Sequence, residues 1–433
     1  MIFLYRGKAA IFLSGIETGD FVEVTSDGKS FRGVLMPRNE LADDLHIVIK
    51  LDTGYNIGIA VGDKTSIGLL ERQKAPPKVK ETEIPLNPDL PTVAILGTGG
   101  TIASKIDYKT GAVAPAFSAA ELHTAIPELS TVANIRTKML FNILSEDMTP
   151  LHWQTIAREA ADDLNSGADG VIVAHGTDTM GYTSAALSFM LTGLGKPVVL
   201  VGSQRSSDRP SSDSAMNLLA ATKVATADCA GVFVVMHASI SDDYCLIHRG
   251  TKVRKMHSSR RDAFRSINAL PVGKITDKVE FFGNMDGRRE GMVKVNERLE
   301  PDVALVKIYP GINEEVLKHI FESKRGVVIE GTGLGHLPAG VLPAVERAKV
   351  LGVPVVMTTQ TLYGRVDMKV YATGRKLLDL GVIPGGDMLP ETALVKLMHV
   401  LGQTNEPAEI SMLMQTNLSG ELADVSRPDG FLR

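Results

Sequence analysis

From Thr92 onward, short unbroken runs of apolar residues alternate with longer segments whose apolar positions recur every three or four residues. The short runs predict strands buried on both faces, and the longer segments predict helices. Their alternation predicts parallel sheets covered by helices on both faces, which is an α/β fold. The predicted strands are 93–96, 139–144, 171–174, 197–201, 231–236, 303–308, 326–329 and 353–357, and the predicted helices are 119–125, 151–165, 179–191, 214–225, 314–321 and 342–351, with three more helical stretches behind them.

The first 73 residues have a different pattern, because short strand-like runs are separated by turn signals such as Asp27-Gly28. Strands are expected at 21–25, 31–36, 46–51 and 55–61, and together they predict a small β-barrel. Five prolines then fall within residues 74–91, which predicts an extended linker. We therefore expect a barrel at 1–73, the linker, a large α/β domain at 92–285 and a smaller one at 286–433, divided by an irregular polar stretch.

Bulk composition restricts the class of protein. The 433 residues suggest roughly three domains, and 44% hydrophobic content is enough for ordinary globular cores. A formal charge of −4 argues against a surface dominated by phosphate binding, although local basic patches remain possible. Cys229 and Cys245 suit neither a disulfide framework nor a zinc site, which favours a reducing compartment. With no apolar run of signal-peptide or membrane-span length, we expect a cytoplasmic protein.

The strand predicted at 171–174 is followed directly by His175, Gly176, Thr177 and Asp178. In open α/β sheets, ligands bind at the carboxyl ends of strands, where the next helix presents free N–H groups. The hydroxyl and the carboxylate are therefore candidates for chemistry. The alternative is helix capping, because Thr and Asp are both favoured N-cap residues.

A second loop of the same layout, residues 97–103, follows the strand predicted at 93–96. It imitates a dinucleotide fingerprint, but Ile102 stands where the third glycine should fall, so a Rossmann site is weakly supported. The glycines allow a sharp turn, and Thr101 could act as a hydroxyl nucleophile with the loop amides stabilising an oxyanion. A turn capped by a threonine is the alternative. Gly28-Lys29-Ser30 resembles a P-loop end but lacks the required glycine at Glu23.

Three further groups could contribute to a site. Tyr108 lies in a polar loop and could relay a proton, although surface tyrosines are common. Ser145 and Glu146 end a strand-like run and could bind polar parts of a substrate, or cap the next helix. The run 249–265 is rich in Arg and Lys, so a solvated face, an anion-binding or RNA-binding loop and a lysine base are all open.

Taken together, these residues resemble the L-asparaginase/glutaminase family. The segments T-G-G-T-I-A at 98–103 and H-G-T-D-T-M at 175–180 correspond to that family's two signatures, and the resemblance runs from about Pro91 to near the C-terminus. It implies amide hydrolysis by a threonine nucleophile and no metal. The implied catalytic residues are Thr101, Tyr108, Thr177, Asp178 and Lys255, and the implied substrate-binding residues are Gly100, Ser145, Glu146 and Gly176.

Two departures from simple asparaginases are the N-terminal barrel with its linker and the basic run around Lys255. With the segments V-R-K-M-H-S-S-R-R-D and S-Q-R-S-S-D-R-P-S-S-D, they make the whole chain resemble the asparaginase-like subunits of archaeal glutamyl-tRNA(Gln) amidotransferases. This resemblance implies a glutaminase without its own cofactor. Its ammonia would pass to the amidotransferase E subunit, which uses ATP and magnesium to convert Glu-tRNA(Gln) to Gln-tRNA(Gln), within a heterotetramer containing a homodimer of this chain. The alternatives are a free-standing L-asparaginase and a non-catalytic RNA-binding subunit.

Overall fold

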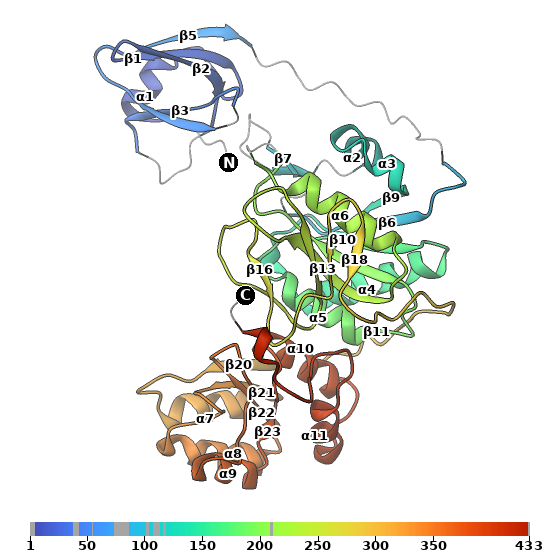
Figure 1. The fold of residues 1–433 in the computed structure, drawn as a ribbon. Coiled ribbons are helices and arrows are strands. Elements are labelled where there is room, and N and C mark those ends of the chain that lie inside the picture. The colour runs from blue at the N-terminus through green and yellow to red at the C-terminus, as the bar shows by residue number, and fades with distance from the viewer. Residues whose placement is uncertain are drawn as a thin grey trace.

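A computed structural model describes residues 5–37, 43–53, 55–72, 86–100, 104–106, 113–115, 118–207 and 211–431 of the chain. Its larger sheets have five, eight and four strands, in that order along the sequence, as Figure 1 shows from blue to red. Among the described residues, no helix is both long and apolar enough to span a bilayer. The strands and helices predicted from the sequence are found within two residues at each end, apart from the strand predicted at 139–144.

The N-terminal region forms one antiparallel sheet with the order β4-β3-β2-β1-β5. Alternate residues of β1, such as Val22 and Val24, are buried, and they pack with Ala9 and Leu13 of the α1 segment. The region predicted as a small barrel is thus a five-stranded sheet with β4 and β5 as its edges, and residues 74–85 of the predicted linker lie outside the described residues. The elements are α1 (Gly7–Phe12), β1 (Phe21–Ser26), β2 (Lys29–Leu35), β3 (His46–Lys50), β4 (Asn56–Ala60) and β5 (Ser66–Glu71).

The eight-stranded sheet has the order β18-β17-β14-β13-β12-β10-β6-β9. From β9 to β13 neighbouring strands are parallel, as predicted, whereas β14, β17 and β18 add an antiparallel edge. Its strands are β6 (Thr92–Gly97), β9 (Asn134–Met139), β10 (Gly170–Ala174), β12 (Pro197–Val201), β13 (Gly231–His237), β14 (Cys245–Arg249), β17 (Gly273–Ile275) and β18 (Val279–Phe281). Three short ribbons accompany it: β7 (Ser104–Ile106) with β8 (Val113–Pro115), β11 (Leu191–Thr192) with β19 (Lys294–Val295), and β15 (Val253–Lys255) with β16 (Phe264–Ser266).

Helices cover both faces of this sheet. Ile172 of β10 faces a core formed with α2, α3 and α6, while Val171 and Val173 face the core formed with α4 and α5. Burial on both faces explains why the central strands are apolar without alternation. The helices are α2 (Ala119–Ala125), α3 (Leu129–Val132), α4 (Pro150–Asn165), α5 (Met180–Met190) and α6 (Ser214–Thr226).

The strand predicted at 139–144 is wrong, because the strand of this region is β9 (Asn134–Met139). β9 is the sheet's edge and pairs with β6 on one side, so it tolerates exposed polar residues such as Arg136 and Lys138. The apolar run that follows belongs to a loop, where Leu140 and Phe141 pack against the core below. The apolar residues that follow β9 therefore reflect burial of a loop, and not a strand.

The C-terminal sheet is parallel throughout, with the order β20-β21-β22-β23. Its helix α10 packs against α5, so both α/β units contribute to one continuous core, and Figure 1 shows α10 between the two sheets. The elements are β20 (Val303–Lys307), α7 (Glu314–Ser323), β21 (Gly326–Gly331), α8 (Leu342–Leu351), β22 (Val355–Thr359), α9 (Ala372–Asp379), β23 (Ile383–Pro384), α10 (Pro390–Leu401) and α11 (Pro407–Gln415).

Candidate active site

Lys255 joins the hydroxyl and the carboxylate that follow β10. Its Nζ donates hydrogen bonds to Thr177 Oγ1 at 2.8 Å and to Asp178 Oδ1 at 2.7 Å. Thr177 is buried and the Lys255 side chain is 13% exposed, whereas the Asp178 side chain is 65% exposed. A lysine held between a hydroxyl and an open carboxylate can exchange a proton with the hydroxyl while the carboxylate balances its charge.

The helix-capping interpretation of Thr177 and Asp178 is wrong. Helix α5 begins at Met180, so its N-cap is Thr179, whose side chain makes no capping hydrogen bond. Instead Thr179 Oγ1 donates to the backbone oxygen of Ser145 at 2.7 Å. The side chains of Thr177 and Asp178 therefore form hydrogen bonds with Lys255 and do not cap the helix.

Backbone contacts bring three predicted segments to one place. A Cβ on Gly100 would lie 2.9 Å from Gly176 Cα, and a Cβ on Gly176 would lie 2.7 Å from Ser145 Cβ. Gly100 also has a φ of +82°, a conformation that side chains disfavour. Thr98 fixes the first loop, because its N–H and hydroxyl both donate to Ala174 O. Gly176 thus lies against both Gly100 and Ser145 at the ends of β6 and β10.

The remaining predicted site residues lie in different situations. Thr101 and Tyr108 fall outside the described residues. Ser145 is buried at the start of a short 3-10 turn, and Glu146 next to it is exposed. The site assignments of all these residues stay predictions.

His175 supports the turn before Thr177, a role that the sequence did not reveal. The ring is fully buried, with Nδ1 donating to Gly176 O at 2.6 Å and Nε2 accepting from Thr183 Oγ1 at 2.8 Å. Trp153 Nε1 donates to the same hydroxyl. Burial lowers the pKa of His175 to about 4, so the ring is neutral at pH 7. Nothing in the local pattern separates such a supporting histidine from a catalytic one.

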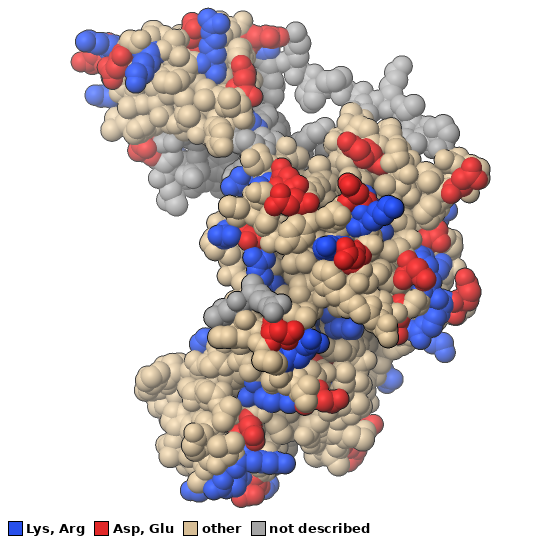
Figure 2. Space-filling model, viewed as in Figure 1, with Lys and Arg blue, Asp and Glu red and all other residues tan. Residues whose placement is uncertain are grey.

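Only part of the basic run 249–265 is a solvated face, because residues 256–260 are exposed while Lys252 and Arg261 are buried. On the face shown in Figure 2, cationic and anionic side chains are interspersed. Most cations of the run are instead paired within the chain: Lys252 with Asp387, Arg254 with Glu391, Lys255 with Asp178, Arg260 and Arg265 with Asp262, and Arg261 with Asp242.

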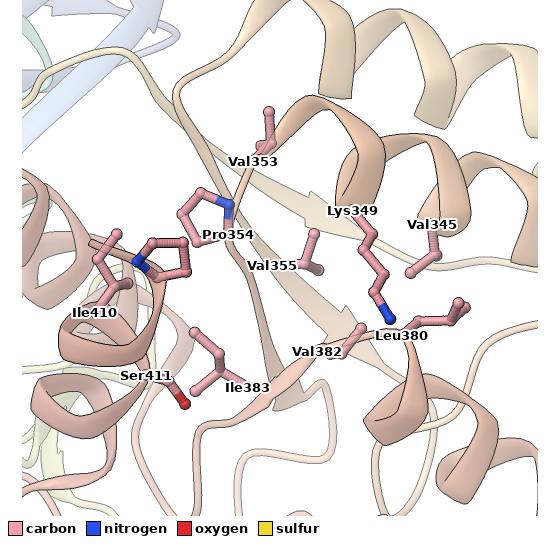
Figure 3. A pocket seen from close by; sticks show the side chains of 13 residues that line it. Val345, Lys349, Val353, Pro354, Val355, Leu380, Val382, Ile383, Ile410 and Ser411 are labelled. Carbon is pink, nitrogen blue, oxygen red and sulfur yellow. The ribbon is translucent and has the colours of Figure 1, made fainter. Parts of the chain in front are cut away.

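A separate apolar groove of about 240 Å³ lies on the C-terminal unit, between α8, the strand ends and α11 (Figure 3). Its walls are mainly aliphatic, including Val345, Val355 and Ile410. Its lysine, Lys349, donates from Nζ to Asp379 O. Its other polar side chain, Ser411, accepts a hydrogen bond from Gln415.

Family comparisons agree with this geometry. The model described as "Asparaginase, N-terminal" matches residues 92–286, and "Glutaminase/Asparaginase C-terminal domain" matches 302–414. The thermostable L-asparaginase from Thermococcus kodakarensis superposes with a TM-score of 0.70 at 36% identity, covering 77% of this chain and 100% of that one. L-asparaginase I from Vibrio cholerae gives 0.68 and 32%, covering 77% and 99%. The fold is that of the asparaginase class of amidohydrolases.

The N-terminal sheet indicates a particular branch of this class, because residues 16–70 match a model described as "GatD N-terminal domain". The D subunit of glutamyl-tRNA(Gln) amidotransferase from Pyrococcus furiosus is 57% identical over 427 residues, covering 96% of this chain and 98% of the relative. The same subunit of Methanothermobacter thermautotrophicus is 50% identical, covering 96% and 97%. The chain belongs to the family of glutamyl-tRNA(Gln) amidotransferase D subunits.

Proposed function

We propose that this chain is the glutaminase subunit of a glutamyl-tRNA(Gln) amidotransferase, hydrolysing glutamine to supply ammonia for converting Glu-tRNA(Gln) to Gln-tRNA(Gln). The observation that carries the proposal is near-full-length similarity to the D subunits, at 57% identity for Pyrococcus furiosus. The match of residues 16–70 favours this function over a free-standing L-asparaginase. The contact of Lys255 with Thr177 and Asp178 favours an enzyme over a non-catalytic RNA-binding subunit.

In the proposed mechanism, the glutamyl group is transferred first to Thr101 and then to water. The Thr101 hydroxyl attacks the side-chain carbonyl of glutamine, and its proton leaves with ammonia, aided by Tyr108. This gives a glutamyl ester on Thr101. Water then attacks the ester, and Lys255 with Thr177 takes the water proton while Asp178 balances the lysine charge. That proton then passes to the Thr101 oxygen as glutamate leaves, which restores the hydroxyl.

Binding of glutamine is assigned to the loops that meet beside this site. Ser145 and Glu146 would hold the α-carboxylate and α-amino ends, and the backbones of Gly100 and Gly176 would lie against the substrate. A Cβ at either glycine would lie within 3 Å of a neighbouring atom, so the two positions leave no room for a side chain beside the substrate.

The rest of the reaction is assigned to partners. We propose that the amidotransferase E subunit binds ATP, magnesium and tRNA(Gln), and that this chain needs no cofactor. The assembly would be a cytoplasmic heterotetramer containing a homodimer of this chain. Co-purification of the chain with a candidate E subunit, followed by assay of Glu-tRNA(Gln) transamidation, tests these statements.

The Thr101→Ala variant tests the nucleophile. It should lower the rate of ammonia release from glutamine by several powers of ten, because no ester can form. Thr155→Ala, which changes a half-buried threonine of α4, is the control and should keep the parent rate. Ammonia release from Thr101→Ala close to the control rate would exclude Thr101 as the nucleophile.

A further inference from the structure

A cavity of about 650 Å³ lies apart from Thr177, Asp178 and Lys255. One wall consists of β14, β16 and β17 at the antiparallel edge of the eight-stranded sheet, and another consists of Tyr363 with the C-terminal residues Asp429 and Gly430. Its volume is within the range of roughly 300–1,000 Å³ that small-molecule sites occupy. The cavity is therefore large enough for a ligand of its own.

A buried histidine lines this cavity with one ring nitrogen unused. His248 is fully buried, and its Nδ1 lies 2.8 Å from Ser266 Oγ, while Nε2 has no hydrogen-bond partner among the described residues. Burial, with Arg265 nearby, lowers the pKa of His248 to about 3, so the ring is neutral and can donate or accept. Buried polar atoms are normally paired, so the wall of the cavity contains an unsatisfied ring nitrogen.

Two cations, Lys274 and Arg265, line the cavity beside aromatic rings, and the carboxylate that lines it, Asp429, is paired with Arg427. Within the part of the chain that the structure describes, Lys274 pairs only with the exposed Glu280, at 3.1 Å, an interaction that an anion can replace at little cost. Arg265 is 30% exposed while bonded to Asp262. The rings are those of Tyr244, Phe282 and Tyr363.

We propose that this cavity binds a nucleotide unit, with its base against the aromatic rings and its phosphate at Lys274 and Arg265. Aromatic side chains bind unstacked bases, and neighbouring cations bind the backbone phosphate. The unit comes either from the end of an RNA chain or from a free nucleotide. The RNA source rests on the proposed function, since that function brings tRNA to the assembly.

The position of the cavity links it to the active site. Its wall strand β16 pairs with β15 so that Arg265 lies opposite Arg254 and Phe264 lies opposite Lys255. A ligand that contacts β16 therefore contacts the strand paired with the one that carries the lysine. Glutamine hydrolysis provides a second readout of binding.

Isothermal titration calorimetry of the full-length chain tests the proposal with AMP, an RNA trinucleotide and inorganic phosphate as probes. AMP or the trinucleotide should bind, and Lys274→Ala and Phe282→Ala should each weaken that binding about tenfold. Phe282 is 47% exposed, so its substitution should not prevent folding. Lys318→Ala, on the exposed side of α7, is the matched control and should bind like the parent chain. The imidazole ¹⁵N signal of His248, assigned with His248→Gln, should shift on saturation.

Tighter binding of the trinucleotide than of AMP identifies RNA as the source, and equal or tighter binding of AMP identifies a free nucleotide. The proposal is overturned by no binding of either at about 10 mM, by phosphate binding as tightly as AMP, or by affinities unchanged in both variants. Glutamine hydrolysis is measured on the same preparations. If the chain hydrolyses glutamine but binds no nucleotide, the nucleotide site is wrong and the proposed function stands. If it binds nucleotide but does not hydrolyse glutamine, the proposed function is wrong and the nucleotide site stands.

Discussion

Thr177 and Lys255 are 78 positions apart in the chain, yet their side chains are in hydrogen-bond contact. The threonine follows a central strand of the sheet, and the lysine ends a short ribbon that is not part of that sheet. The hydrogen bond between the two side chains runs from Lys255 Nζ to the Thr177 hydroxyl. A substitution that removes the hydroxyl but keeps the side-chain shape therefore measures what the hydroxyl contributes to the reaction.

The Thr177→Val variant keeps a branched side chain but cannot pass a proton to or from Lys255. Glutamine hydrolysis should fall by about 10²–10⁴-fold, the usual contribution of general acid–base catalysis. Steady-state kinetics should show the loss in kcat more than in KM. Thr226→Val changes a threonine in the last turn of α6 and is the control. A loss confined to KM would assign Thr177 to binding instead of proton transfer.

Buried histidines make the stability of this chain sensitive to acid. The pKa of His399 is lowered to about 4 by burial, with Lys396 adding to the effect. The unfolded chain binds the proton near pH 6.5 and the folded chain near 4, so this contribution to stability is complete above pH 6.5 and is lost as the pH falls to 4. His175, with a pKa of about 4, acts in the same direction.

The His399→Leu variant should therefore lose less stability than the parent chain between pH 7 and pH 5. The expected difference is about 2 kcal/mol in the free energy of unfolding. Leucine can keep the packing against Phe189, whose ring stacks on His399 at 6.0 Å. Urea unfolding at both pH values measures the effect, with His319→Leu on the surface of α7 as the control. Equal pH dependence in the His399 variant and the parent would contradict the argument.

At the scale of elements, the position of β15 depends on the C-terminal unit. Just before β15, Lys252 Nζ bonds to Asp387 Oδ2 at 2.7 Å, and both side chains are 2% exposed. Within the strand, Arg254 Nη1 bonds to Glu391 of α10 at 2.9 Å. One of these cross-unit ion pairs lies just before the strand that ends at Lys255 and the other within it, so α10 and its preceding turn hold the lysine in place.

Breaking the buried pair on one side should destabilise the chain more than replacing both partners. Asp387→Leu leaves Lys252 as an unpaired buried cation, and the expected loss is about 3–5 kcal/mol. The double variant Lys252→Met with Asp387→Leu should recover much of that loss, since it leaves no buried charge. Urea unfolding of the two single variants and the double variant measures the coupling. Additive losses would show that the pair does not act as a unit.

The sequence predicted most helices and strands because the pattern of apolar residues in each matches the faces that it buries in the fold. Central strands were unbroken apolar runs, and sheet burial on both faces requires that composition. β9 was misplaced because an edge strand needs no apolar run, and β5 was missed because most of its residues are exposed. The meeting of Gly100 with Gly176 and Ser145, and the internal pairing of the basic run, depend on contacts between distant segments. Local periodicity carries no information about such contacts.

At the scale of the whole molecule, the N-terminal sheet has its own core. The cluster around Val22, Val24, Ile47 and Ile49 draws its members only from residues 5–67, whereas the two α/β units share a core through α5 and α10. Elements that share a core should unfold together, and a separate core should unfold by itself.

Deletion of residues 1–72 should therefore leave a folded chain that still hydrolyses glutamine. Calorimetry should show one thermal transition fewer than in the full-length chain, with the remaining midpoint nearly unchanged. Co-purification with a candidate E subunit then tests whether the deleted sheet contributes to assembly. Loss of solubility and of the main transition would show that the N-terminal sheet is required for the fold of the α/β units.

The contact between Gly100 and Gly176 also restricts how this enzyme can evolve. Any side chain at Gly100 would meet the backbone of the other signature loop, and any side chain at Gly176 would meet Ser145. No single substitution at either position is sterically free, so both should remain glycine in any library selected for activity. Selection for a new amide substrate should accordingly enrich changes at the exposed rim, such as Glu146, and leave the two glycines untouched.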